Sequence, residues 1–105
     1  MTKKVKNVKG FQMNRKTGHV SYVYEQKQKK AKSIGFTHNK DDKAPKRKLN
    51  HNINPNDLGH CYAKTKIEIQ KSSDYRSKQD YKGYKIHAED KPIIVEIIKN
   101  NKKRR

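Results

Sequence analysis

Net charge is the feature that most limits what this chain can fold into. Its 105 residues include 28 Lys and Arg against 10 Asp and Glu, so the formal net charge is +18 with neutral histidines. Repulsion of this size opposes compaction, and a polyanion is the partner that relieves it most strongly. Nucleic acid is therefore the favoured partner, ahead of an anionic membrane or an acidic protein.

The apolar residues are few but grouped. Only 30% of the residues are hydrophobic and 36% are charged, which is close to the composition of disordered chains. Grouping still permits a small core, and the length favours one domain. We expect a flexible basic arm over residues 1–10, a single α+β domain over residues 11–100 and a basic tail over residues 101–105.

Cysteine usage and hydropathy predict a cytoplasmic protein. Cys61 is the only cysteine, so neither an intramolecular disulfide nor a Cys-rich zinc cage can form. The basic N-terminus is followed by no apolar signal core. The longest apolar run, Ile93-Ile94-Val95, is too short to span a bilayer, and no membrane partner is expected.

Alternating residues predict a small antiparallel sheet of three or four strands. Residues 19–25 are β-branched and aromatic, and residues 32–38 place Ile34 and Phe36 on one face. A polar connection between these segments favours a hairpin. Cys61 to Ile69 alternates again and predicts a third strand with one apolar face, and residues 81–87 are compatible with a short fourth.

The last element is predicted as an amphipathic helix over residues 91–100. Asp90 is a favourable N-cap and Pro92 suits the first turn. Four isoleucines then follow helical spacing, and they indicate a helix packed on the sheet. The predicted fold class is α+β, an antiparallel sheet with one C-terminal helix and a basic N-terminal arm. Residues 39–57 contain no recognisable element.

Two histidines bracket the predicted hairpin. His19 begins its first strand and His38 ends its second, so the two should be neighbours opposite the turn. A neutral imidazole can take the proton of a ribose 2′-hydroxyl while a protonated one supplies the leaving 5′-oxygen. With Tyr62 assisting at the phosphate, these residues form a candidate catalytic set that needs no metal or cofactor. The alternative is that both histidines are polar residues at strand ends.

The segment from Asn50 to Tyr62 is the second candidate site. Asn54 and Asn56 suit base edges or phosphate oxygens, and Tyr62 can stack on a base. Alternatively, the asparagines satisfy the backbone of their own turn. The spacing of the histidines, aspartate and cysteine between residues 51 and 61 matches no common zinc pattern, so no metal site is predicted.

Tyrosines interleaved with lysines are the third signal. Such patterns are typical of single-stranded nucleic-acid binding, where bases stack on rings and phosphates contact cations. Packing of the same rings in the core is the alternative. The 23 lysines and 5 arginines favour phosphate contact over bidentate base reading. The predicted nucleic-acid contacts are Arg47, Lys48, Asn54, Asn56, Lys64, Lys66, Tyr81, Tyr84 and Lys85.

Three short motifs resemble a group of small basic proteins from prophages and other mobile elements of low-GC Gram-positive bacteria. The motifs are His19-x-Ser21-Tyr22-x-Tyr24, Ile34-Gly35-x-Thr37-His38 and Asn52-x-Asn54-Pro55-Asn56-Asp57. The resemblance covers residues 11–98. It implies a mobile-element setting, in which toxin ribonucleases and DNA-binding accessory proteins both occur, and it carries over no catalytic residue.

Together these patterns predict a protein directed at RNA, with a metal-independent endoribonuclease of the toxin–antitoxin kind as the leading hypothesis. A non-catalytic RNA- or DNA-binding module is the first alternative. The second is a basic protein that docks on an acidic partner, such as a cognate antitoxin.

Overall fold

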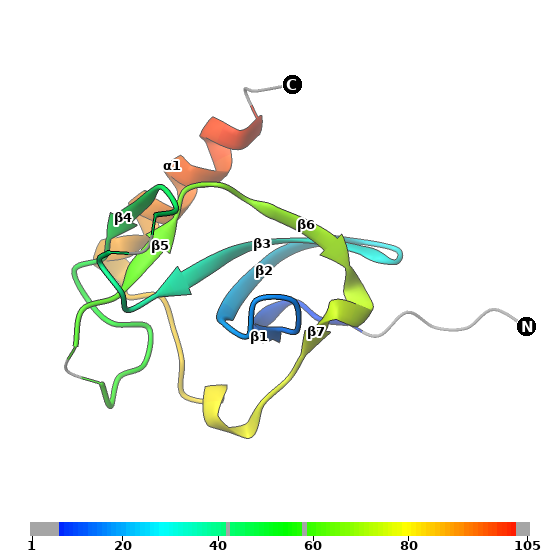
Figure 1. The fold of residues 1–105 in the computed structure, drawn as a ribbon, viewed down its shortest axis with the longest axis horizontal. Coiled ribbons are helices and arrows are strands. Elements are labelled where there is room, and N and C mark those ends of the chain that lie inside the picture. Colours follow the sequence, from blue (N-terminus) through cyan, green and yellow to red (C-terminus); the bar gives the residue numbers. More distant parts are fainter. Residues whose placement is uncertain (1–6, 42, 58, 103–105) are drawn as a thin grey trace, which may run out of the picture.

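The computed structural model of the chain describes residues 7–41, 43–57 and 59–102, and it contains more strands than predicted (Figure 1). The class is α+β, as expected, but the sheet has seven strands instead of three or four. The strands are β1 (Gly10–Asn14), β2 (Val20–Lys27), β3 (Lys30–Thr37), β4 (Lys46–Lys48), β5 (Tyr62–Lys64), β6 (Glu68–Lys71) and β7 (Tyr75–Arg76). The helices are the short 3-10 turns η1 (Ser72–Asp74), η2 (Gln79–Tyr81) and η3 (Ala88–Asp90), followed by α1 (Lys91–Lys102).

The sheet is antiparallel throughout and is built around the predicted β2–β3 hairpin. Its order is β4-β5-β3-β2-β1-β7. The seventh strand, β6, follows β5 in the chain and also pairs with β3. The C-terminal end of β3 therefore pairs with β5, and its N-terminal part pairs with β6. Because η1 leads directly from β6 into β7, and β7 pairs with β1, the sheet curls on itself (Figure 1).

The predicted third strand is interrupted. Pairing runs from Phe36↔Ala63 to Ser33↔Glu68, which is three steps along β3 but five along the segment after Cys61. The two extra residues form a bend that separates β5 from β6. Beyond this bend Ile69 is 61% exposed, although the alternation predicted a buried side chain.

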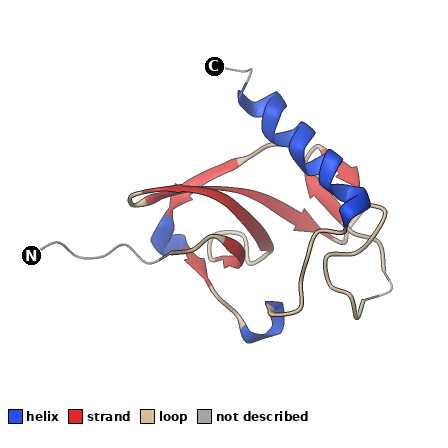
Figure 2. Cartoon of the chain, turned by 180° about the vertical axis from the view of Figure 1, so that it is seen from behind, coloured by secondary structure: helices blue, strands red, loops and turns tan. Residues whose placement is uncertain are grey.

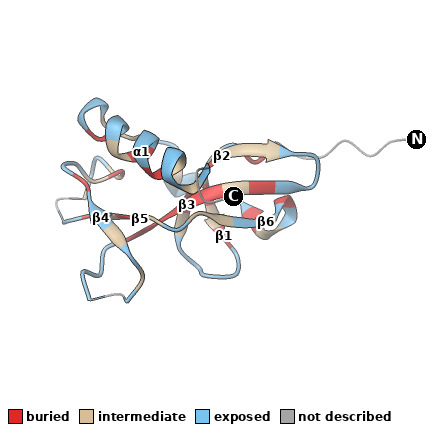
Figure 3. Ribbon diagram, turned by 90° about the horizontal axis from the view of Figure 1, so that it is seen from above, coloured by how far each residue is buried: buried red, intermediate tan, exposed pale blue. Residues whose placement is uncertain are grey.

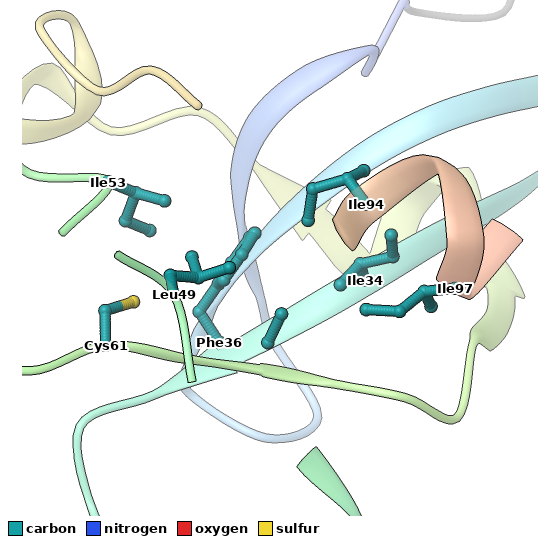
Figure 4. Packing of buried hydrophobic residues seen from close by; sticks show 8 residues of the cluster. Ile34, Phe36, Leu49, Ile53, Cys61, Ile94 and Ile97 are labelled. Carbon is teal, nitrogen blue, oxygen red and sulfur yellow. The ribbon is translucent and has the colours of Figure 1, made fainter. Parts of the chain in front are cut away.

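The main hydrophobic core lies between one face of the sheet and α1. Ile94 and Ile97 of α1 are buried against Ile34 and Phe36 of β3, and Leu49, Ile53, Cys61 and Ala63 complete the cluster (Figure 4). Figure 2 shows α1 lying against this face. The predicted helix is confirmed, with two further residues at its end. Among the described residues, no helix has both the length and the apolar character needed to cross a membrane.

The opposite face of the sheet buries polar side chains, and hydrogen bonds satisfy most of them. The Asn14 side-chain amide donates to Glu68 Oε2 at 3.0 Å, and the Ser33 and Tyr75 hydroxyls lie 2.6 Å apart. A second apolar cluster accompanies them, made of Val8, Val23, Ala31 and Tyr75. Figure 3 shows that β3 is buried along most of its length, because both faces of the sheet are covered there.

Two predicted terminal segments and one predicted strand differ in part from the described structure. Residues 1–6 of the predicted arm lie outside the described residues, but Val8 is buried and its N–H donates to Gln26 Oε1. At the other end, α1 continues through Lys102, and residues 103–105 of the predicted tail also lie outside the described residues. The fourth strand predicted at residues 81–87 does not form. That segment forms a turn after η2 and then an irregular stretch over residues 84–87, here called the strap. The Lys85 N–H in the strap donates a hydrogen bond to the Ile53 carbonyl.

Candidate nucleic-acid interface

Three lysines and a tyrosine gather on one face of the β4–β5 pair. Lys46 lies opposite Lys64, and Lys48 lies opposite Tyr62. Cross-strand partners share a face, and so do residues two apart on one strand. Lys46, Lys48, Tyr62 and Lys64 therefore form one continuous patch, here called the lysine face, at the end of the sheet where β4 is the last strand.

The intervening residues point the other way, toward α1. Arg47 pairs with Ala63, which pairs with Phe36, and the last two are buried in the core. The Arg47 guanidinium reaches α1 and contacts Glu96 Oε2 at 2.7 Å. Arg47 was predicted to bind nucleic acid together with Lys48, but its charge is engaged on the opposite side of the sheet.

Two of the three lysines on this face, Lys48 and Lys64, have no ion-pair partner in the described part of the chain. Like charges placed directly opposite each other on neighbouring strands destabilise the pairing. The register places Lys46 directly opposite Lys64 on the neighbouring strand.

Gly35 gives the Lys64 side chain room to lie along the sheet. A Cβ at this glycine would stand 3.4 Å from Lys64 Cδ and 3.0 Å from Glu68 Oε1. Glu68 is held in turn by Asn14 through its other carboxylate oxygen. The absent side chain at Gly35 thus lets a lysine and a carboxylate approach the backbone of β3 side by side.

His38 adjoins the lysine face. Thr37, the last residue of β3, pairs with Tyr62, and His38 follows it. The Nδ1 of His38 lies 3.2 Å from the carbonyl oxygen of His60, so in this contact Nδ1 must carry the proton and donate. The Nε2 atom of a neutral His38 is then an acceptor. Of the predicted catalytic residues, the structure therefore brings His38 and Tyr62 into the same region.

In the described part of the chain, the contacts of His19 are with other residues. It lies in an exposed bend before β2, where its carbonyl oxygen accepts the Asn14 N–H at 2.9 Å. Pairing of β2 with β3 ends at Ser21↔Gly35, two residues before β3 itself ends, and β5 pairs with the opposite edge of β3. Within the described part of the chain, no hydrogen bond or ring contact connects His19 with His38. The predicted acid–base pair and its alternative, two polar residues at strand ends, therefore both stay predictions.

The asparagine-rich segment caps its own turns. The Asn54 N–H donates to Asn52 Oδ1, and the Asn56 N–H donates to Asn54 Oδ1. The Asn52 amide also donates to the carbonyl of Gly59. The self-capping interpretation is therefore confirmed for this loop, and the predicted contacts of Asn54 and Asn56 with nucleic acid stay untested predictions.

Tyr81 and Tyr84 pack against the protein itself. Their ring centroids are 4.9 Å apart, and the Tyr84 ring lies 6.0 Å from that of Phe11 beside the main core. Burial raises the pKa of both hydroxyl groups. The packing interpretation fits these two tyrosines better than stacking on bases. Lys66 and Lys85 are exposed, on the bend after β5 and on the strap.

Sequence reasoning missed two groups. Lys46 was left among residues 39–57 without a recognised element, because the three basic residues of β4 show no alternation of polar and apolar side chains. His87 and Glu89 drew no attention because their neighbour in space, His51, lies far away in the sequence. The nearby Asp90, predicted as a helix N-cap, instead accepts the backbone N–H of His51.

Comparison with known proteins assigns no family to the chain. No family model, curated protein or solved structure matches it. The resemblance to small basic mobile-element proteins therefore stays a prediction, and the chemistry of the lysine face is the guide to function.

Proposed function

We propose that the chain binds single-stranded RNA through the lysine face. The observation that carries the proposal is the register of β4 and β5, which sets three lysines and Tyr62 side by side, pointing away from α1. A cytoplasmic location is part of the proposal, and the buried, unpaired Cys61 is consistent with it.

The chemistry of this face suits a nucleic-acid strand. Lysine ammonium groups neutralise phosphates as mobile point charges, and the Tyr62 ring offers a surface on which a base can stack. Combined charge and stacking hold single strands with little dependence on sequence. The excess of lysine over arginine supports the same kind of contact.

We propose that the chain binds RNA without cleaving it. Transfer of the 2′-hydroxyl proton and protonation of the leaving oxygen need two groups placed on either side of one phosphate. His38 lies beside the lysine face, but His19 has no described contact with it. The endoribonuclease hypothesis therefore has less support than the binding module.

The neighbouring residues Lys48 and Arg47 provide a matched test, because they lie on opposite faces of one strand. We expect Lys48→Gln and Lys64→Gln each to weaken binding of a labelled single-stranded RNA by about 5-fold at moderate salt, because each loses a phosphate contact. Arg47→Gln should weaken it less than about 2-fold. Tyr62→Ala should cost about 10-fold through lost stacking. Fluorescence anisotropy measures all four.

Equal losses for Lys48→Gln and Arg47→Gln would contradict the proposed face and leave only diffuse attraction. A parallel titration with single-stranded DNA of the same sequence reports the preference between the two nucleic acids. RNA shortened during incubation in EDTA would restore the ribonuclease hypothesis. Loss of all binding at physiological salt would favour an acidic protein partner instead.

A further inference from the structure

His51, His87 and Glu89 form a second cluster, separate from the lysine face. His51 follows β4 in the asparagine-rich loop, whereas His87 and Glu89 lie at η3, directly before α1. One donor atom from each of the three residues lies within 4.8 Å of the other two. The imidazole rings of the two histidines are stacked, with centroids 3.7 Å apart and planes inclined by 21°.

The spacing of these donors fits a tetrahedral metal ion. Zinc bonds to nitrogen and oxygen are about 2.0–2.1 Å long, which places neighbouring ligands about 3.4 Å apart. His51 Nε2 and Glu89 Oε1 are already 3.6 Å apart. With all three donors within 4.8 Å, closure around an ion needs a movement shorter than one zinc–ligand bond. Two imidazoles and one carboxylate are a ligand set that zinc uses with a water as the fourth ligand.

A buried carboxylate fixes the backbone that carries the first ligand. Asp90 is fully buried, and its Oδ2 accepts the N–H of His51 at 2.9 Å. Its Oδ1 accepts two bonds from Asn50, one from the backbone and one from the side chain. Loop and η3 are therefore held together before any ion arrives. With Glu89 next to Asp90, the cluster also gathers negative charge in a strongly basic chain.

Metal binding would exchange one hydrogen bond for a coordination bond. The Nδ1 of His87 accepts the N–H of Glu89 at 3.1 Å, so the neutral ring carries its proton on Nε2. An ion bound at Nδ1 takes this lone pair and displaces the Glu89 N–H, and the ring proton stays on Nε2. An ion bound at Nε2 instead requires that proton to move to Nδ1 and the ring to turn away from the Glu89 N–H. The stacked rings must also open from their angle of 21°, which the partly exposed side chains permit.

We propose that His51, His87 and Glu89 bind a divalent transition-metal ion, with Zn²⁺ as the representative, and that a fourth position stays open to water. The ion would tie the loop after β4 to the start of α1. This proposal does not depend on RNA binding.

The test uses the full chain, purified without a histidine tag and treated with EDTA. Titration with Co²⁺, which absorbs visible light where Zn²⁺ does not, should give a tetrahedral spectrum that saturates at one ion per chain and disappears on adding Zn²⁺. The variants His51→Gln, His87→Gln and Glu89→Gln should each weaken binding by about 10-fold or more. His19→Gln, an exposed histidine outside the cluster, should bind as the wild type does.

NMR of the wild-type imidazole groups gives an independent readout that no variant can confound by failing to fold. Zn²⁺ should shift the ring resonances of His51 and His87 and leave those of His19 unchanged. No cobalt spectrum, or one that persists at full strength in His87→Gln, would overturn the proposal. Shifts confined to other histidines or to Cys61 would do the same.

Discussion

At the scale of single residues, Asp90 stabilises the fold by joining two distant segments. Its carboxylate is fully buried and accepts three N–H groups from Asn50 and His51. Asp90→Ala leaves these donors without an acceptor, so we expect the free energy of unfolding to fall by about 2–4 kcal/mol. Urea unfolding followed by circular dichroism measures it. Asp80→Ala, an exposed aspartate in η2, serves as control and should change stability by less than about 0.5 kcal/mol.

Tyr24 gives the fold a dependence on alkaline pH. Burial, together with the nearby Glu25 charge, raises the pKa of its hydroxyl to about 12, above the ordinary value of 10.0. Because folding favours the protonated hydroxyl, its contribution is complete below pH 10 and is lost as pH rises toward 12. Allowing for partial exposure, we expect a loss of about 1 kcal/mol. Urea midpoints at pH 8 and 11 should therefore differ more for the wild type than for Tyr24→Phe, and equal differences would contradict the assignment.

At the scale of elements, Gly35 sets how closely the side chains of β5 and β6 approach β3. A Cβ there would stand 3.0 Å from Glu68 Oε1, whose carboxylate is held by Asn14. We expect Gly35→Ala to displace this carboxylate and to lower the free energy of unfolding by about 1 kcal/mol. In a Glu68→Ala background the same change should be nearly neutral. A double-mutant cycle measures the coupling, and additive losses would show that the carboxylate is not what the methyl group meets.

Local periodicity was enough for the β2–β3 hairpin and for α1, because each buries an apolar stripe that repeats along its own sequence. It missed β1 for a physical reason: Gln12 and Asn14 are buried there through bonds to Ser77 and Glu68, which lie 65 and 54 residues away. A polar side chain satisfied by so distant a partner looks solvent-exposed in the sequence.

The candidate sites were predictable to a similar extent. Lys48 and Lys64 were predicted as nucleic-acid contacts and Tyr62 as a catalytic residue at the phosphate, but the side on which each residue points depends on β4 pairing with β5. That pairing separates Arg47 from its neighbours and could not be seen in the sequence. The His19–His38 pair stays a prediction, because the β2–β3 pairing ends at Ser21↔Gly35, before either histidine is reached.

At the scale of the whole molecule, electrostatic repulsion between basic side chains opposes folding, since there are 28 basic residues and only 10 acidic ones. Salt and RNA should relieve it in distinguishable ways. Raising NaCl from about 0.02 to 0.3 M shortens the Debye length from about 20 to 6 Å, so the Tm of the free protein should rise by several degrees.

RNA should raise the Tm most at low salt, because salt weakens the binding that produces the stabilisation. The curves of Tm against NaCl concentration for free and RNA-bound protein should therefore converge, one rising while the other falls. At low salt, Lys48→Gln should reduce the difference in Tm between the RNA-bound and the free protein. It should leave the rise in Tm of the free protein with NaCl concentration almost unchanged. Differential scanning calorimetry of both proteins measures this. A Tm of the free protein that falls on adding NaCl would mean that attractive ion pairs outweigh repulsion, despite the net charge of +18.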